Sequence, residues 1–308
     1  MAITAKQVAD LRAKTGCGLM DCKKALVESE GDFDAAIKIL REKGLATAAK
    51  KADRIAAEGV VDILRSEDGK TAAMIEVNAE TDFVAKNDTF MAFVKGVLRT
   101  IIAKKPADLE ALKNEKYDGT GDTVAETLVQ LIATIKENIS IRRFLIVEGQ
   151  INTYIHGHGQ TGVIVKFDTD DETAATDAFK EMSKNVALQV AAMNCQYVNR
   201  AAVPASVIAE ENEIYAVKIN NDEKNANKPA AVKEKMALGM LNKFFSQVCL
   251  AEQAYVKEES LTVEKYVASV AKELGKAITL VDFYRFEKGE GLQKREDNFA
   301  EEIAQMVK

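Results

Sequence analysis

The sequence lacks the features that mark membrane-spanning and secreted proteins. No uninterrupted apolar run approaches the roughly eighteen residues that a membrane span requires. The amino terminus, MAITAKQVADL, has neither the basic and apolar regions of a secretory signal nor the Arg-rich character of a transit peptide. We therefore expect a cytoplasmic protein.

Cysteine and histidine are both scarce. The cysteines do not show the paired C-x-x-C spacing of zinc or redox sites, so we expect reduced, mostly buried thiols. Two imidazoles two positions apart, with no obvious third ligand, do not make a metal site. The residues concerned are Cys17, Cys22, Cys195, Cys249, His156 and His158. We expect neither a metal nor a cofactor.

Motifs for catalysis are also missing. The chain has no G-x-x-x-x-G-K-[ST] phosphate loop and no G-x-S-x-G nucleophile elbow. The string GHGQTG, Gly157 to Gly162, fits G-x-G-x-x-G, but the alternating segment IVKF follows where a dinucleotide site needs a helix. We interpret this string as a hairpin turn and predict that the chain is not an enzyme.

The charge balance argues against a general nucleic-acid binder. With 42 basic and 48 acidic side chains, the net charge is −6 and the pI about 5.3, which does not favour binding to phosphates. A chain of 308 residues is also too long for one compact core of the commonest size. We predict two or three modules.

Residues 1–44 are typical of three short helices. Thr4 and Gln7 form a capping-box pattern, which predicts a helix from Ala5 to near Gly16. A second helix is expected over about 19–30. Asp32 can cap the third, which we expect to close at Gly44. The following LATAAKKADRIAA is helix-prone and basic at its centre, and we interpret it as a helical linker.

From Glu58 the hydrophobic period changes to two, and the pattern then repeats. Alternating apolar residues around Asp68-Gly69 predict a β-hairpin, followed by a helix over about 88–103. Glu58-Gly59 is matched by Glu148-Gly149, an offset of 90 positions (148 − 58), and Gly69 and Thr71 are matched at the same offset. We predict a structural duplication and an α+β fold, with antiparallel sheets covered by helices.

Two further helical segments depart from the repeat. Apolar residues on either side of the polar break NNDEKNANKP predict two helices joined by a solvated turn, inserted into the second half. After Gly289 and Gly291, an amphipathic helix bearing Phe299 and Ile303 is expected at the end of the sequence as a docking element.

The segment TDFVAKND, Thr81 to Asp88, holds an aromatic residue beside an acidic one in a loop. Asp82-Phe83 alone is typical of a loop aspartate followed by a core phenylalanine. The second copy has Glu172 and Thr173 at the equivalent positions, so the scaffold can be built without the aromatic. We therefore interpret Phe83 as a protruding anchor.

Four motifs, in order along the chain, resemble those of the elongation factor Ts family: TGCGLMDCKKAL, TDFVAKND, ENISIRR and RFEKGEGLQKREDNFAEEIAQMVK. The resemblance implies an amino-terminal domain similar to a ubiquitin-associated (UBA) fold, a duplicated core, a coiled-coil hairpin and a carboxy-terminal module. The expected divisions are 1–54 for the UBA-like domain and linker, 55–140 for the first core half, 141–200 with 252–286 for the second, 201–251 for the hairpin and 287–308 for the module.

The family implies a function and the residues that carry it. It implies a guanine nucleotide exchange factor that binds elongation factor Tu, in its GDP-bound and nucleotide-free states, and makes no direct contact with nucleic acid. Residues that would dislocate Mg²⁺ from Tu are Thr81, Asp82, Phe83 and Val84. Other implied Tu contacts are Leu19, Met20, Lys23, His156, Phe299 and Ile303. A homodimer within a complex of two chains with two Tu molecules is also consistent with the resemblance.

Some positions depart from the family, and other readings stay open. The departures are Asn227-Lys228-Pro229 at the hairpin turn, Gln253-Ala254-Tyr255 after it, and Lys136 in place of a glycine. Leu19 could equally be a core residue, because Cys22 and Leu26 share its helical face. The alternative functions are a protein-binding adaptor or holdase without exchange activity, and an enzyme using the neighbourhood of His156 and Asp168.

Overall fold

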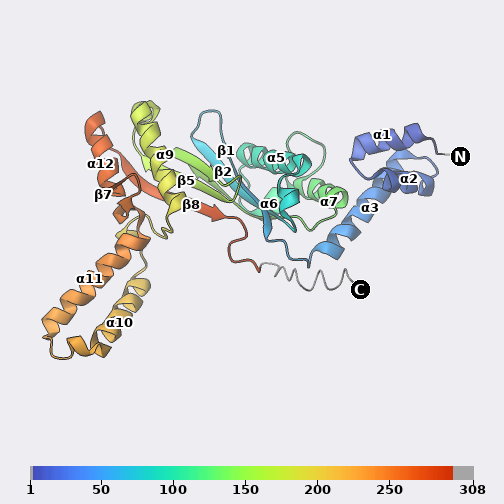
Figure 1. The fold of residues 1–308 in the computed structure, drawn as a ribbon. Coiled ribbons are helices and arrows are strands. Elements are labelled where there is room, and N and C mark those ends of the chain that lie inside the picture. The colour runs from blue at the N-terminus through green and yellow to red at the C-terminus, as the bar shows by residue number, and fades with distance from the viewer. Residues whose placement is uncertain (1–2, 294–308) are drawn as a thin grey trace.

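The computed structural model describes residues 3–293, and these residues form a mixed α+β fold. Two three-stranded antiparallel sheets, with strand orders β1-β2-β3 and β4-β5-β8, lie at the centre (Figure 1). The expected α+β class is therefore confirmed. The strands are β1 (Glu58–Arg65), β2 (Thr71–Ala79), β3 (Ser140–Glu148), β4 (Gln150–His156), β5 (Thr161–Asp168) and β8 (Thr279–Glu287).

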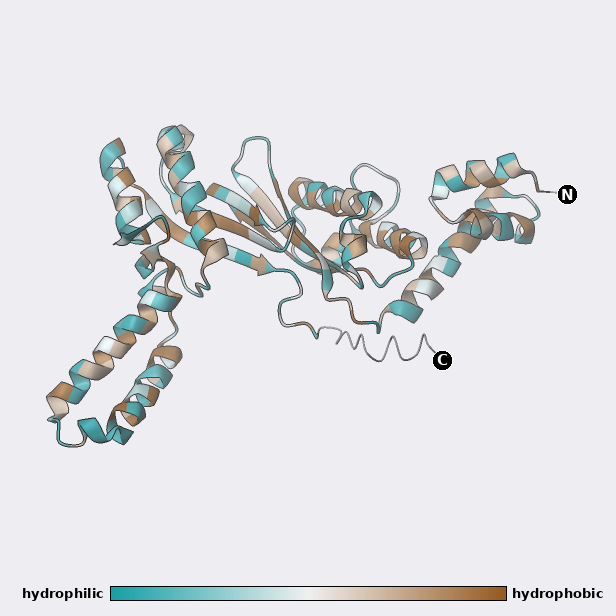
Figure 2. Ribbon diagram, in the orientation of Figure 1, coloured by the Kyte–Doolittle hydropathy of each residue, from teal (hydrophilic) through white to brown (hydrophobic). Residues whose placement is uncertain are grey.

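Each sheet is buried on both faces. In β2, Ile75 and Val77 face a core shared with α5 and α7, whereas Met74 faces the other sheet and packs near Ile151 and Ile164. The second sheet packs in the same way against α9 and α12. Figure 2 shows hydrophobic residues concentrated on the strands between these helices. The covering helices are α5 (Asp88–Lys104), α7 (Val124–Ile135), α9 (Asp177–Ala192) and α12 (Val263–Leu274).

Three helices precede the sheets, as the sequence predicts, but the third is longer than expected. They are α1 (Ala5–Thr15), α2 (Leu19–Glu28) and α3 (Phe33–Lys51). The capping box of Thr4 and Gln7 is present, and Gly16 ends α1 in the left-handed conformation. The predicted end of the third helix at Gly44 is wrong. Gly44 is buried inside α3, where an added Cβ would lie 3.2 Å from Val129 Cγ1 of α7.

The duplication is visible in the strand pairing. Val60 pairs with Val77 in the first hairpin, and the residues 90 positions later, Gln150 and Phe167, pair in the second. The third strand of each sheet joins with the same irregularity, which falls at Glu76/Val77 in one sheet and at Lys166/Phe167 in the other. The predicted offset of 90 positions is therefore confirmed at the level of register.

The first copy extends further along the chain than the expected division at residue 140. β3 pairs with β2, and it follows α7 as β8 follows α12, both at an offset of 139 positions (263 − 124 and 279 − 140). Each copy is thus a hairpin, helices and a third strand. By strand pairing, the boundary between the copies lies at Gly149, between β3 and β4.

The expected match between Phe83 and Thr173 is wrong by one residue. Short helices follow the hairpins, α4 (Asp82–Ala85) and α8 (Asp171–Ala175), and their N-cap residues are Thr81 and Asp170, an offset of 89 (170 − 81). Phe83 is therefore equivalent to Glu172, and both are exposed, whereas Val84 and Thr173 are both buried. The conclusion that the second copy lacks the aromatic is unchanged.

The predicted pair of helices in the second copy is confirmed. α10 (Ala205–Asn221) and α11 (Ala230–Val248) form an arm that extends away from the sheets (Figure 1). A small cluster around Val203, Leu241 and Phe245 packs at its base.

A helix that the sequence did not predict is α6 (Leu109–Asn114), which buries Leu112. A two-stranded sheet follows the arm, formed by β6 (Ala254–Tyr255) and β7 (Glu258–Thr262). Within the described residues, no helix is both long and apolar enough to cross a membrane.

Candidate functional site

The corner that follows β2 presents an aromatic side chain to solvent. Phe83, on the one-turn helix α4, is 79% exposed, the highest value of any large hydrophobic residue in 3–293. A buried phenylalanine would have contributed about 1.5–3 kcal/mol to folding, so this ring gives the folded chain little. The expectation that Phe83 protrudes, rather than joining the core, agrees with this exposure.

The two sides of α4 are anchored in the protein. Val84 is 6% exposed and belongs to the core between the first sheet and α5. The Asn87 side chain accepts hydrogen bonds from the N–H groups of Thr89 and Phe90 at 2.9 and 3.2 Å and so caps α5. Phe90 is fully buried. Because its neighbours are anchored, the fold fixes the backbone position from which Phe83 projects.

Two carboxylates join this corner to the segment that leads into β3. Glu137 Oε2 accepts from the N–H groups of Glu80 and Thr81 at 3.1 and 3.0 Å, and Glu137 Oε1 accepts from Thr81 Oγ1 at 2.7 Å. In the reverse direction, Glu80 Oε1 accepts from the Asn138 N–H at 2.6 Å. Thr81 is therefore held through its backbone and its side chain.

The same corner holds the chain that leaves α3. The Asn138 side-chain amide donates to the carbonyl oxygens of Ala52 and Arg54 at 3.2 and 2.8 Å. Arg54 Nη1 lies 3.4 Å from Glu80 Oε2. The linker after α3, the end of β2 and the start of β3 thus meet in one polar cluster beside Phe83.

Asp82 adds an exposed carboxylate to the corner. Lys86 Nζ donates to its carboxylate at 2.8 Å, and this hydrogen bond holds the pKa of Asp82 below its ordinary value. Both side chains are largely exposed, so their pairing contributes little to folding. An aspartate is ionised at neutral pH in any case, so a negative charge directly precedes Phe83 in the chain.

The sequence-predicted residues of the first three helices lie on the surface. Leu19 is 50% and Met20 59% exposed on α2, and Lys23 is also exposed. The alternative that Leu19 is a core residue is wrong, because only Cys22 and Leu26 of that face are buried. Val27, one turn after Lys23, is also 59% exposed and was not predicted as a contact residue. The helical spacing of these residues could have indicated it.

His156 lies at the end of β4, beside the GHGQTG turn. Its Nδ1 lies 3.1 Å from the Tyr154 hydroxyl, and its ring is exposed. Asp168 is at the opposite end of the paired strands, because His156 pairs with Thr161 whereas Asp168 lies beyond Phe167 and Gln150. The structure therefore does not bring His156 and Asp168 together into a reactive pair.

The GHGQTG string is a hairpin turn, as predicted, and its glycines allow the two sheets to meet. Gly159 has φ 91°, and its carbonyl oxygen accepts from the Val61 N–H at 2.8 Å. A Cβ on Gly159 would lie 2.1 Å from Val60 Cγ2, and one on Gly162 would lie 2.6 Å from Val61 Cγ1. The motif thus serves contact between sheets.

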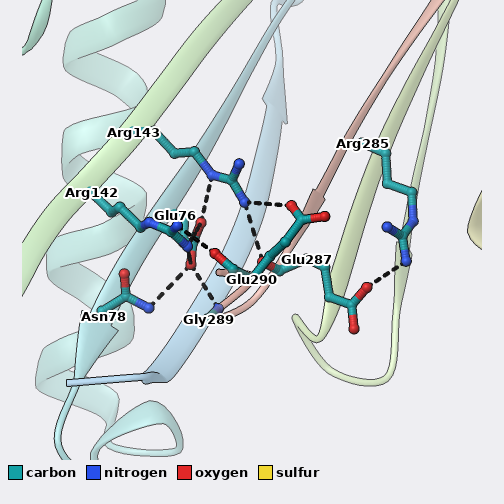
Figure 3. Close-up of polar contacts among 8 residues, drawn as sticks. All are labelled: Glu76, Asn78, Arg142, Arg143, Arg285, Glu287, Gly289 and Glu290. Carbon is teal, nitrogen blue, oxygen red and sulfur yellow. Dashed lines mark hydrogen bonds and ion pairs between the residues drawn. The ribbon is translucent and has the colours of Figure 1, made fainter. Parts of the chain in front are cut away.

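A buried carboxylate directs the chain that follows β8. Glu76 is fully buried and accepts from Arg142 and Arg143 of β3 and from the Gly289 N–H, the last at 2.8 Å (Figure 3). Burial by itself raises the pKa of a carboxyl, but these hydrogen bonds outweigh it and hold the pKa of Glu76 below its ordinary value. Arg143 also contacts Glu290 at 3.2 Å.

This Glu76 cluster was not predicted, although residues from two of the four family-like sequence motifs meet in it. ENISIRR supplies Arg142 and Arg143, and RFEKGEGLQKRED supplies Gly289 and Glu290. The signal that could have found it is a single charged residue inside the mostly apolar strand TAAMIEVNA. Phe299 and Ile303, which were expected to dock on the partner, lie outside the described residues. In residues 3–293, no group of three or more His, Cys, Asp or Glu side chains is arranged to hold a metal.

Comparison with known proteins assigns the family. The family model described as "Elongation factor TS" matches residues 80–290. The chain is 49% identical to elongation factor Ts of Syntrophotalea carbinolica, with full coverage of both chains. It is 46% and 47% identical to elongation factor Ts of Clostridium kluyveri and of Clostridioides difficile, with 99% of each chain covered. With matches that span both the exposed corner and the duplicated sheets, this chain belongs to the elongation factor Ts family.

Proposed function

We propose that this chain, a member of a family of translation elongation factors, is a guanine nucleotide exchange factor for elongation factor Tu. It binds Tu·GDP, disturbs the Mg²⁺ and phosphate site, and promotes GDP release so that GTP can bind. The observation that supports this proposal best is Phe83, a ring that is 79% exposed on a corner fixed by the fold. An exposed aromatic of this kind is typical of an anchor for a partner.

The proposed mechanism exchanges one kind of binding for another. Mg²⁺ and backbone amides hold a diphosphate by concentrated charge, and displacing them weakens nucleotide binding. Burial of the Phe83 ring between elements of Tu, worth about 1.5–3 kcal/mol, partly replaces what is lost. Asp82, Thr81 and Val84 hold the ring in place. Because the coupling is reciprocal, GDP weakens binding of this chain by the same factor.

No covalent step is part of this proposal, and the chain acts as a binding protein and not as an enzyme. Linkage between two ligands of Tu accounts for exchange without a reacting group on this chain. The direction of exchange then depends on the concentrations of GTP and GDP. His156 and Asp168, which lie at opposite ends of their hairpin, take no part as a reactive pair.

Other surfaces extend the contact with Tu in this proposal. The three-helix domain, which we propose to be UBA-like, contacts Tu through Leu19, Met20 and Lys23. The second copy contacts Tu through His156. The α10–α11 arm is a coiled-coil hairpin, and the carboxy-terminal module with Phe299 and Ile303 docks on Tu. We propose that the domains are divided after residues 54, 200, 251 and 286, with the boundary between the two copies at Gly149. We also propose that two copies of this chain associate within a 2:2 complex with Tu.

The test is release of fluorescent GDP from Tu, with and without this chain. Phe83→Ala is expected to lower the maximal acceleration by about tenfold or more, since its burial corresponds to one to two powers of ten. Glu172→Ala, at the equivalent position of the second copy, is the matched control and should leave the rate unchanged. Because Phe83 is exposed, its removal should leave stability within about 0.5 kcal/mol.

Two outcomes would contradict this assignment. An unchanged release rate with Phe83→Ala would remove the ring from the mechanism. Binding of Tu by the unmodified chain with no acceleration of GDP release would support the adaptor or holdase function instead.

A further inference from the structure

We propose that Glu137 is a positioning residue for Phe83, and this inference rests on the proposed exchange function. Its carboxylate lies across the corner from α4 and receives three hydrogen bonds, from the N–H groups of Glu80 and Thr81 and from the Thr81 hydroxyl. Glu137 is partly buried and lies on a different segment of the chain from Phe83. Its role is to fix the backbone from which the ring projects.

The local structure explains why α4 depends on such a residue. α4 contains four residues, and its N-cap Thr81 makes no side-chain hydrogen bond to the helix. A helix of one turn is not stable by its own hydrogen bonds. The Thr81 hydroxyl is directed instead to Glu137 Oε1 at 2.7 Å. Glu137 therefore supplies the fixed point on one side of Phe83, as Val84 does on the other.

The second copy provides an internal comparison. At the offset of 139 positions, the counterpart of Glu137 is Lys276, whose Nζ lies 3.3 Å from Asp170 and 3.0 Å from Glu172. Asp170 and Glu172 are the counterparts of Thr81 and Phe83. The charge at this position is reversed, and the groups that it contacts change from neutral N–H and hydroxyl donors to carboxylates. A carboxylate that receives backbone N–H groups is thus found in the copy with the exposed ring.

Rigid presentation changes the exchange step more than it changes binding of Tu. A corner that is already in its bound conformation does not have to be ordered when the ring enters the partner. We call the three hydrogen bonds that Glu137 accepts from Glu80 and Thr81 the clamp. Other surfaces of this chain hold Tu, so loss of the clamp should lower the maximal rate of GDP release. The concentration of chain that gives half of that rate should change little.

The experiment is a double-mutant cycle on the full-length chain. Glu137→Ala is expected to lower the maximal GDP-release rate about tenfold, with the half-saturating concentration within about twofold. In the Phe83→Ala background the same change should have less than about a twofold further effect, since both act through one ring. Glu137→Gln keeps one acceptor oxygen and should recover part of the rate. Equal losses from Glu137→Ala in both backgrounds would overturn the inference.

A second measurement does not depend on exchange activity. Hydrogen exchange of the free chain should show faster exchange of the Glu80 and Thr81 amides in Glu137→Ala, with unchanged protection in β5. Unchanged exchange at these amides would also overturn the inference. If these amides exchange faster while Phe83→Ala leaves GDP release intact, the clamp stands and the proposed role of the ring fails. If Phe83→Ala abolishes acceleration while Glu137→Ala does not lower it, the clamp fails alone.

Discussion

Lys136 and Gly275 end equivalent helices in the same left-handed backbone conformation. Lys136, after α7, has φ 65°, and Gly275, after α12, has φ 63°. Glycine adopts this conformation at no steric cost, whereas for a residue with a Cβ it costs about 1–2 kcal/mol. The first copy therefore carries strain at the residue directly before Glu137.

Replacement of Lys136 by glycine should relieve this strain. We expect Lys136→Gly to raise the free energy of unfolding by about 0.5–1 kcal/mol, after the greater freedom of glycine in the unfolded chain is subtracted. The lost pairing with Asp21, at 3.9 Å between exposed groups, contributes little. Urea denaturation would measure the change. Lys136→Ala keeps the Cβ, and an equal gain from it would show that conformation is not the cause.

Glu76 should make folding sensitive to acid. Its pKa is lowered in the folded chain, so its ionised form contributes stability above the unfolded value near 4.3, and this contribution is lost as pH falls through the folded pKa. Glu76→Gln should cost about 2–4 kcal/mol at pH 7, because two arginines lose their buried partner. The difference from the unmodified chain should shrink below about pH 4. Exposed Glu67→Gln is the control, and a difference that stays constant from pH 7 to 3 would contradict the assignment.

The turn that joins the two sheets should not accept a side chain. Gly159→Ala combines φ 91° with a Cβ 2.1 Å from Val60 Cγ2, and it should destabilise the chain by about 2–3 kcal/mol. Gly239 lies inside α11 with no atom within 4 Å of an added Cβ. Gly239→Ala should therefore stabilise by up to about 1 kcal/mol. Thermal unfolding of both variants would measure the contrast, and equal effects would refute it.

The seating of the first three helices on the core should depend on Gly44. An added Cβ already lies 3.2 Å from Val129 Cγ1 and 3.6 Å from Ala133 Cβ, so a leucine has no room. Gly44→Leu should separate α3 from α7. Hydrogen exchange should then increase at the positions of α7 that α3 no longer covers, while both sheets stay protected. Exposed Leu45→Ala should have no such effect. If the amides of α7 stay protected from hydrogen exchange in Gly44→Leu, the packing of α3 on α7 does not depend on close contact at Gly44.

Local sequence patterns predicted the elements that depend on local interactions. The capping box at Thr4 correctly indicated the start of the first helix, and the repeat of Glu58-Gly59 indicated two hairpins. The exposure of Phe83 followed from comparing the two copies, although the alignment used was wrong by one residue. Periodicity was sufficient here because the apolar residues of these elements recur at the period of a helix or of a strand.

The polar clusters could not be predicted in this way. Glu137 and Thr81 are 56 positions apart, and Glu76 and Gly289 are 213 apart. Such contacts depend on how distant segments pack together, and a single carboxylate in a sequence has no periodicity. The end of α3 was missed for a related reason. Gly44 is typical of a helix end, but here it allows α7 to approach closely.

The arm leaves the core through a closed base. Gln196 and Tyr197 donate their N–H groups to the Val248 carbonyl oxygen at 2.8 and 3.1 Å, and Leu250 donates back to Tyr197 at 2.8 Å. The two ends of the arm are therefore joined by their own backbone before α10 begins. A protrusion attached in this way imposes no path on the chain beneath it, so evolution can lengthen, shorten or replace it while the duplicated scaffold is inherited unchanged.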